Sequence, residues 1–305
     1  MTIDASARAH LVALLLLMLP LSGFAACPPQ GQSVEQAKAL IDSGHVIDDQ
    51  AARQSYALEL ADCLASPDPQ LRDRLAYTGL ATWLRGGQLE VATRQALIER
   101  LRAVVAAGPD PSGFHWSFSM MVLSELVRAD RIDPQLAPAE LSAVVAEAAA
   151  AYRHIDDHRG YDAQAGWRHA PAHGADWLLQ LAVHPGVDAD ALATLMRALA
   201  SQIAPTGTHA YIHSESERQA RAAYFAYQRG LLDAAWWQAW LDTLVAPGEL
   251  GQWGAAFDSE PGLARRHNTL AFLHELGFAA RANPSEANAQ LAAMVDGAVR
   301  TVKGG

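Results

Sequence analysis

The feature that most constrains the fold is a long series of helix-forming segments, each ended by Gly, Pro or Asp. Between these breaks, no stretch alternates apolar and polar residues as a half-buried strand does. Ala and Leu dominate the 305 residues and only 7% are aromatic, which favours helix along most of the chain. We therefore predict an all-α fold. The expected helices span residues 33–43, 48–65, 69–85, 88–107, 112–129, 137–154, 168–183, 188–204, 214–229, 233–245, 261–280 and 285–302.

Short loops join these segments two by two, which predicts paired antiparallel helices. Two arrangements build such pairs into one body: a HEAT-like solenoid and a closed α/α toroid. No fixed period is visible in the sequence, so both arrangements stay open. With 50% hydrophobic residues, the chain can build one large core, and we expect a single all-α domain over residues 27–305.

Residues 1–26 have the layout of a secretory signal peptide. Arg8 precedes an apolar run over residues 11–21, and small residues follow up to residue 26. The run is too short to span a membrane comfortably, and Pro20 interrupts it. Cleavage of the leader would export the chain to the periplasm or the medium and leave no membrane span; an uncleaved leader that anchors the chain is the alternative.

The chain has two cysteines, Cys27 and Cys63. In an oxidising compartment they could form one disulfide. Cys27 also directly follows the leader, so lipid attachment to its sulfur is the alternative, although Phe24 fits a lipobox poorly. The two outcomes exclude each other, because each uses the Cys27 sulfur.

Charge and missing motifs exclude several classes of function. The formal net charge is −10, and no run of Lys or Arg could neutralise a phosphate backbone, so nucleic acid is not an expected partner. The sequence also lacks a serine nucleophile elbow, a P-loop and a dinucleotide glycine motif.

The stretch "GWRHAPAHGADW", residues 166–177, contains the main candidate site. On a helix starting near residue 167, with Pro171 in its first turn, His169, His173 and Asp176 point the same way. Two imidazoles and a carboxylate could bind zinc or a similar divalent ion with positions left for water. Two alternatives stay open: the residues only pack helices together, or they serve in acid-base chemistry or bind an anion at the positive end of the helix.

Two flanking segments add polar candidates. The loop "DDHRGYD", residues 156–162, offers Asp157 and Arg159 for a ligand. Alternatively, Asp157 anchors the loop by an ion pair with Arg159 or Arg168. In "HAYIHSESERQAR", residues 209–221, Ser214 is expected to cap a helix with Glu217 at the capping-box position.

This cap leaves two charged side chains free. Glu215 and Arg218 can then face the histidine helix. There Glu215 could move a proton as a general acid or base, and Arg218, like Trp167, is a candidate for ligand binding.

Four blocks of the sequence resemble the uncharacterised bacterial family named domain of unknown function 2785, in order over about residues 66–230. The blocks are "DPQLRDRLAYTGLATWL" (68–84), "FSMMVLSELVRAD" (118–130), "DDHRGYDAQAGWRHAPAHGADWLLQLA" (156–182) and "ESER" (215–218). The resemblance implies a helical protein without an established activity. Pro171 and the leader depart from the family pattern. His209 and His213 lie outside it, so they rank below His169 and His173.

Two functions follow as hypotheses. The first is a ligand-binding or scaffold role in the cell envelope, with a small molecule or an envelope protein as partner. The second is an envelope hydrolase, with or without a metal ion. In that hydrolase His169, His173 and Asp176 would hold the ion and Glu215 would move the proton.

Overall fold

The structure, a computed structural model, describes residues 27–29 and 31–304. The predicted signal peptide lies outside the described residues. Helices make up most of the described chain, which confirms the all-α prediction. The longest interhelical segment also contains a two-stranded antiparallel ribbon that the sequence pattern did not predict.

The helices follow the predicted breaks closely. Their bounds are α1 (Val34–Asp42), α2 (Gln50–Cys63), η1 (Gln70–Tyr77), α3 (Thr78–Arg85), α4 (Val91–Ala107), α5 (His115–Ile132), α6 (Pro138–Arg153), α7 (Ala170–Ala182), α8 (Ala189–Ala200), α9 (Glu215–Gln228), α10 (Ala234–Val245), η2 (Gly248–Leu250), η3 (Trp253–Asp258), α11 (Glu260–Ala282) and α12 (Glu286–Gly304). The ribbon consists of β1 (Tyr161–Asp162) and β2 (Gly166–Trp167).

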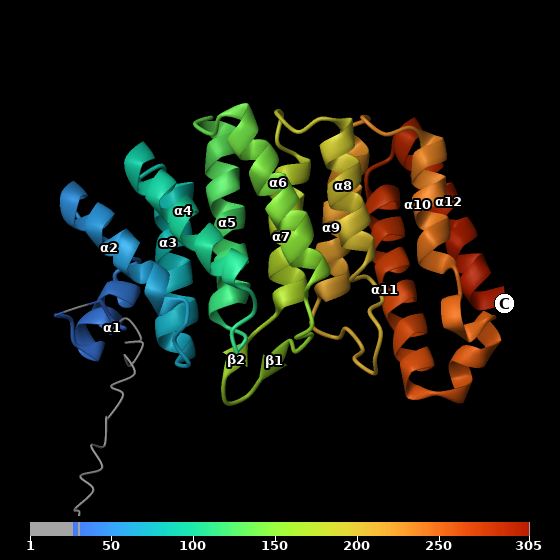
Figure 1. Cartoon of the computed structure of the whole chain (residues 1–305), viewed down its shortest axis with the longest axis horizontal. Coiled ribbons are helices and arrows are strands. Elements are labelled where there is room, and N and C mark those ends of the chain that lie inside the picture. The colour runs from blue at the N-terminus through green and yellow to red at the C-terminus, as the bar shows by residue number, and fades with distance from the viewer. Residues whose placement is uncertain (1–26, 30, 305) are drawn as a thin grey trace, which may run out of the picture.

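The long helices pack in two rows. Helices α3, α5, α7, α9 and α11 contact one another in succession, and so do α2, α4, α6, α8, α10 and α12. The rows run along the long axis of the molecule, with α1 at one end and the C-terminal α12 at the other (Figure 1). Each helix therefore packs beside the next but one in the sequence, so α5, α7 and α9 begin at the same edge, where the ribbon lies (Figure 1).

Small residues on α7 let it pack closely between its neighbours. A Cβ atom at Gly174 would lie 2.6 Å from the Tyr152 ring, inside contact distance. The Tyr152 hydroxyl donates a hydrogen bond to the Pro171 carbonyl oxygen at 3.2 Å. This close approach fixes the position of the α7 N-terminus, and with it the adjacent histidine motif.

Arg72 in η1 is a fully buried arginine that the sequence did not single out. Its guanidinium donates to the carbonyl oxygens of Ser66 at 3.0 Å and Ala165 at 2.8 Å. It also lies 4.0 Å from the centroid of the Phe114 ring. Since Ala165 directly precedes β2, Arg72 joins the ribbon to η1, which continues directly into α3.

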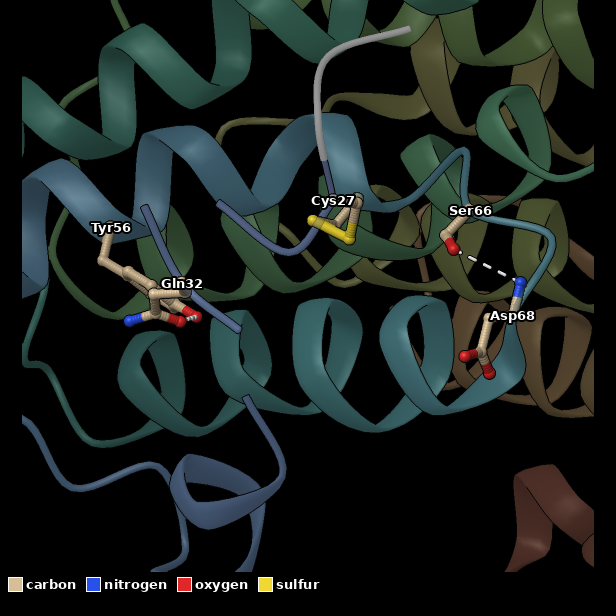
Figure 2. Close-up of a disulfide and its surroundings, with 6 residues drawn as sticks. Cys27, Gln32, Tyr56, Ser66 and Asp68 are labelled. Atoms are coloured by element: carbon tan, nitrogen blue, oxygen red, sulfur yellow. Dashed lines mark hydrogen bonds between the residues drawn. A yellow bond between two sulfur atoms is a disulfide. The ribbon is translucent and has the colours of Figure 1, made fainter. Parts of the chain in front are cut away.

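A disulfide between Cys27 and Cys63 attaches the N-terminal segment to α2 (Figure 2). Nearby, the Tyr56 hydroxyl donates a 2.6 Å hydrogen bond to Gln32 Oε1, which holds the same segment (Figure 2). Of the two outcomes left open for Cys27, the structure contains the disulfide. Among the helices of the described residues, none combines the length and the apolar character needed to cross a membrane.

Candidate functional site

The candidate site lies where α5, α7 and α9 begin, beside the ribbon (Figure 1). Tyr161 pairs with Trp167 in the ribbon. Two further backbone bonds continue the pairing, because the amides of Arg168 and His169 donate to the carbonyl oxygens of Gly160 and Arg159, each at 2.9 Å. The ribbon thus delivers His169 to the N-terminus of α7.

His169 precedes the helix instead of lying in its first turn. Helix α7 begins at Ala170, and His169 is its N-cap residue with a left-handed φ of 58°. The predicted start near residue 167 was therefore wrong, because the chain up to Trp167 pairs as a strand. Pro171 does lie in the first turn, as predicted, where no amide donor is needed.

Ser214 also has a left-handed backbone, with a φ of 67°, and its side chain makes no capping hydrogen bond. The predicted capping box was wrong; the His213 amide donates to Glu215 Oε2 at 2.8 Å beside it. Three non-glycine residues of the described chain have positive φ, and two of them, His169 and Ser214, directly precede α7 and α9. Such strained backbone occurs preferentially at functional sites.

Polar atoms from three residues converge at the first residue of α9. Glu215 is fully buried, and its Oε1 lies 3.5 Å from His169 Nε2 and 3.8 Å from His213 Nδ1. Both separations exceed the usual hydrogen-bond range. Each of these three atoms is buried without a hydrogen-bond partner among the described residues. The site thus holds a carboxylate oxygen with a ring nitrogen of each histidine nearby but not hydrogen-bonded to it.

Only a glycine fits at residue 160 above this group. A Cβ atom there would lie 2.3 Å from His213 Nδ1 and 3.0 Å from Glu215 Oε1. The ribbon backbone can therefore lie directly over Glu215, which explains how a charged residue becomes fully buried at the edge of the fold.

Burial lowers the pKa values of two imidazoles near Glu215, those of His169 and His209. It is the main cause that lowers the pKa of His169, and the charge of Glu215 only partly opposes it. Burial likewise lowers the pKa of His209, again against the charge of Glu215. A neutral imidazole keeps one nitrogen lone pair, which can accept a proton or bind a cation.

The aromatic ring of Trp167 covers this group on one side. It stacks on the His169 ring at 4.8 Å between centroids and meets the His213 ring edge-on at 5.9 Å. Trp167 remains 37% exposed, and Tyr161, 50% exposed, packs against it at 5.0 Å. These two rings form the solvent-facing wall of the site.

The other predicted metal ligands face different partners. His173 Nδ1 lies 2.9 Å from Ser117 Oγ, and its ring packs edge-on against Phe118 at 4.8 Å. Asp176 forms an ion pair with Arg218. Within residues 27–29 and 31–304, no three His, Cys, Asp or Glu side chains are grouped to hold a metal ion. Zinc binding by His169, His173 and Asp176 stays a prediction, and the contacts favour packing roles for the last two.

His173→Ala is expected to lower the free energy of unfolding by about 1–3 kcal/mol, because it deletes a buried ring and one partner of Ser117. Urea unfolding followed by circular dichroism measures the change. His154→Ala is the matched control, since His154 is an exposed histidine at the end of α6. A loss no larger than that of the control would contradict the packing role.

Asp176 is a largely buried carboxylate, and its titration should make the free energy of unfolding depend on pH. Burial is the main cause that raises its pKa from 3.8 to about 6, and Arg218 opposes the shift. The folded state therefore binds more protons than the unfolded state between about pH 4 and 6. The stability that Asp176 contributes is complete below its unfolded pKa and is lost as pH rises through its folded pKa.

Asp176→Asn removes this titration. Thermal unfolding of both proteins from pH 4 to 7 should therefore show the wild type losing stability relative to the variant as pH rises. A constant difference across this range, or one of opposite sign, would contradict the raised pKa.

Asp157 and Arg159 pair with each other. Arg159 Nε donates to Asp157 Oδ1 at 2.8 Å, within the same loop. This contact matches the predicted ion-pair anchor of the loop, with Arg159 itself mostly exposed. Arg168 pairs instead with Asp162 at 2.5 Å.

Sequence reasoning undervalued His213 and missed Gly160. The sequence ranks His213 low because it lies outside the pattern of the resembled family, although it stands two residues from Glu215. Gly160, in "RGYD", had a usable signal, since a lone glycine in a polar loop often marks close backbone approach.

Comparison with known proteins gives one match. The sequence profile of the family described as "Protein of unknown function (DUF2785)" matches residues 101–278, more than half of the chain. This range contains His169, His213 and Glu215, and it begins and ends later than the predicted core of residues 66–230. No curated protein and no solved structure matches. The chain therefore belongs to the DUF2785 family.

Proposed function

We propose that this chain is an exported protein that binds a small ligand in the cell envelope, at the site around Glu215. The observation that carries the proposal is the group of His169 Nε2, His213 Nδ1 and Glu215 Oε1, all buried and unpartnered among the described residues. A buried polar atom without a partner costs about 1–3 kcal/mol. A ligand that contacts all three atoms offsets this cost.

The surroundings of the site support the same proposal. The Trp167 and Tyr161 rings offer an exposed apolar wall beside a buried carboxylate, and ligand sites commonly combine apolar walls with a few convergent polar groups. Arg218 is engaged by Asp176 and Arg159 by Asp157, so both predicted ligand-binding arginines act at the rim by positioning their neighbours.

Two features support the envelope location and the finer architecture. The signal-like leader and the Cys27–Cys63 disulfide both suit an oxidising compartment outside the cytoplasm. The two rows of helices, with α1 and α12 at opposite ends (Figure 1), favour an open HEAT-like solenoid over a closed toroid.

A hydrolase is the second candidate, and one observation favours it. A buried carboxylate, Glu215, lies 3.5 Å from the imidazole of His169. Such a pair can take a proton from water and return it to a leaving group. In that function Glu215 accepts the proton, and the His213 amide orients the carboxylate.

Native mass spectrometry of the mature protein, purified from an exporting host without chelator, tests the proposal. We expect a bound mass on the wild type that is absent from Glu215→Gln and retained by Glu217→Gln, an exposed residue on the same helical turn. No bound mass on any of the proteins would leave the cluster with a scaffold role and contradict ligand binding.

The hydrolase is tested separately with p-nitrophenyl acetate as a chromogenic ester. Turnover by the wild type and Glu217→Gln, together with its loss in Glu215→Gln, would make hydrolysis the leading function. Equal background rates in the three proteins would exclude esterase activity at this site.

A further inference from the structure

We propose that the site is a zinc site whose protein ligands are His169 Nε2, His213 Nδ1 and Glu215 Oε1. The inference rests on the proposed ligand-binding role and names the ligand as a divalent cation. It differs from the set predicted from sequence, with which it shares only His169. Two imidazoles and one carboxylate are a common set of protein ligands at zinc sites that keep a position open for water.

The separations from Glu215 Oε1 to the two ring nitrogens fit a shared ion better than direct hydrogen bonds. Zinc binds nitrogen and oxygen at about 2.0–2.2 Å, so two ligands at a tetrahedral angle lie about 3.4 Å apart. The structure has 3.5 Å from Glu215 Oε1 to His169 Nε2 and 3.8 Å to His213 Nδ1. The described side chains do not form a metal site as they stand. Shared coordination requires the longer separation, from Glu215 Oε1 to His213 Nδ1, to shorten by about 0.4 Å.

Neighbouring groups already hold the proposed ligands in place. The His213 amide donates to Glu215 Oε2 at 2.8 Å, which orients the carboxylate and leaves Oε1 free. Trp167 stacks on one ligand ring and meets the other edge-on. Such contacts around the ligands typically tune the affinity of a metal site.

The strained backbone fits the same site. His169 and Ser214 both adopt left-handed conformations, and each lies at the start of a helix that carries or adjoins a proposed ligand. This conformation at residue 169 directs the His169 side chain toward the start of α9, where Glu215 lies. The cost of the two conformations is consistent with a structure selected for positioning these side chains.

The residues predicted from sequence are engaged elsewhere. His173 bonds Ser117 across to α5, and Asp176 pairs with Arg218. The His173 ring does pack edge-on against the His169 ring, at 5.6 Å between centroids, but its Nδ1 is held by Ser117. The two ligand sets therefore make opposite predictions for variants of His213 and Asp176.

Isothermal titration of chelator-treated mature protein with zinc chloride tests the site. We expect one zinc per wild-type chain and an affinity reduced by more than about 100-fold in His213→Ala, beyond the range for loss of a supporting contact. His154→Ala, an exposed histidine outside the site, should bind as the wild type does. Circular dichroism verifies that each variant folds. If His213→Ala does not fold, the titration is repeated with His213→Gln, which is a smaller change.

Two outcomes overturn the inference: no zinc bound by the wild type, or an affinity of the His213 variants equal to that of the wild type. The second outcome together with loss of zinc in Asp176→Asn would favour the ligand set predicted from sequence. X-ray absorption of the zinc-loaded protein adds a readout of ligand type, with only nitrogen and oxygen expected at about 2.0–2.2 Å. An organic mass bound to the wild type and lost in Glu215→Gln, without zinc binding, would overturn the zinc site and leave the proposed ligand-binding function standing.

Discussion

Arg72→Ala is expected to lower the free energy of unfolding by about 3–5 kcal/mol, the range for removing one partner of a buried ion pair. The side chain is fully buried and contacts Asp73 at 2.7 Å. The substitution leaves this carboxylate without its ion-pair partner, removes the donors to the Ser66 and Ala165 carbonyl oxygens, and empties the space beside Phe114. Each loss acts on the junction between η1 and the ribbon.

Urea unfolding followed by circular dichroism measures this effect. Arg74→Ala is the matched control, because Arg74 lies two residues along the same helix with an exposed side chain, and we expect a change within about 0.5 kcal/mol. A loss below about 1 kcal/mol in Arg72→Ala would show that the ribbon does not depend on this arginine.

Cys27→Ser is expected to lower the free energy of unfolding by about 3–4 kcal/mol. The disulfide joins residues 36 positions apart, so it restricts a long loop in the unfolded chain. In the folded state it attaches the N-terminal segment to α2, whose Cys63 is completely buried. Without the bond, that segment depends on weaker contacts such as Tyr56 with Gln32.

Reductant provides an internal control for this prediction. Dithiothreitol should destabilise the wild type by the same amount and leave Cys27→Ser unchanged, since the chain has only two cysteines. Mass spectrometry of the mature N-terminus checks the premise, because a lipid on Cys27 would add its mass and prevent the disulfide. A wild type that is insensitive to reductant would contradict the stabilising role.

The helices were predictable because their signals are local. Ala-rich and Leu-rich segments between Gly, Pro and Asp breaks favour helix wherever they occur, and the observed helices follow the predicted ranges. Two errors concern helix N-termini, and another is the end of α8, at Ala200 instead of residue 204. At His169 the chain pairs with the ribbon, and beside Ser214 the His213 amide bonds Glu215 while the predicted cap does not form. A single sequence does not reveal these tertiary contacts.

The site was predictable only in part, because contacts between residues distant in sequence leave no local signal. Glu215 and His169 do lie together, as the sequence reasoning anticipated for two polar residues on neighbouring helices. His173 and Asp176 share the same motif, yet their partners, Ser117 and Arg218, lie on α5 and α9, far from them in sequence. Spacing along one helix defines a face, but packing decides which neighbour that face meets.

By itself, the sequence determined the all-α class, the breaks between helices and the polar residues available for a site, because each depends on local composition and periodicity. Only the tertiary structure decided that Arg72 supports the ribbon, that Gly160 lies over Glu215 and that His213 completes the group with His169. Arg72 and Ala165 lie 93 positions apart, and His169 and Glu215 about 45, and such distant pairings arise from the packing of whole helices.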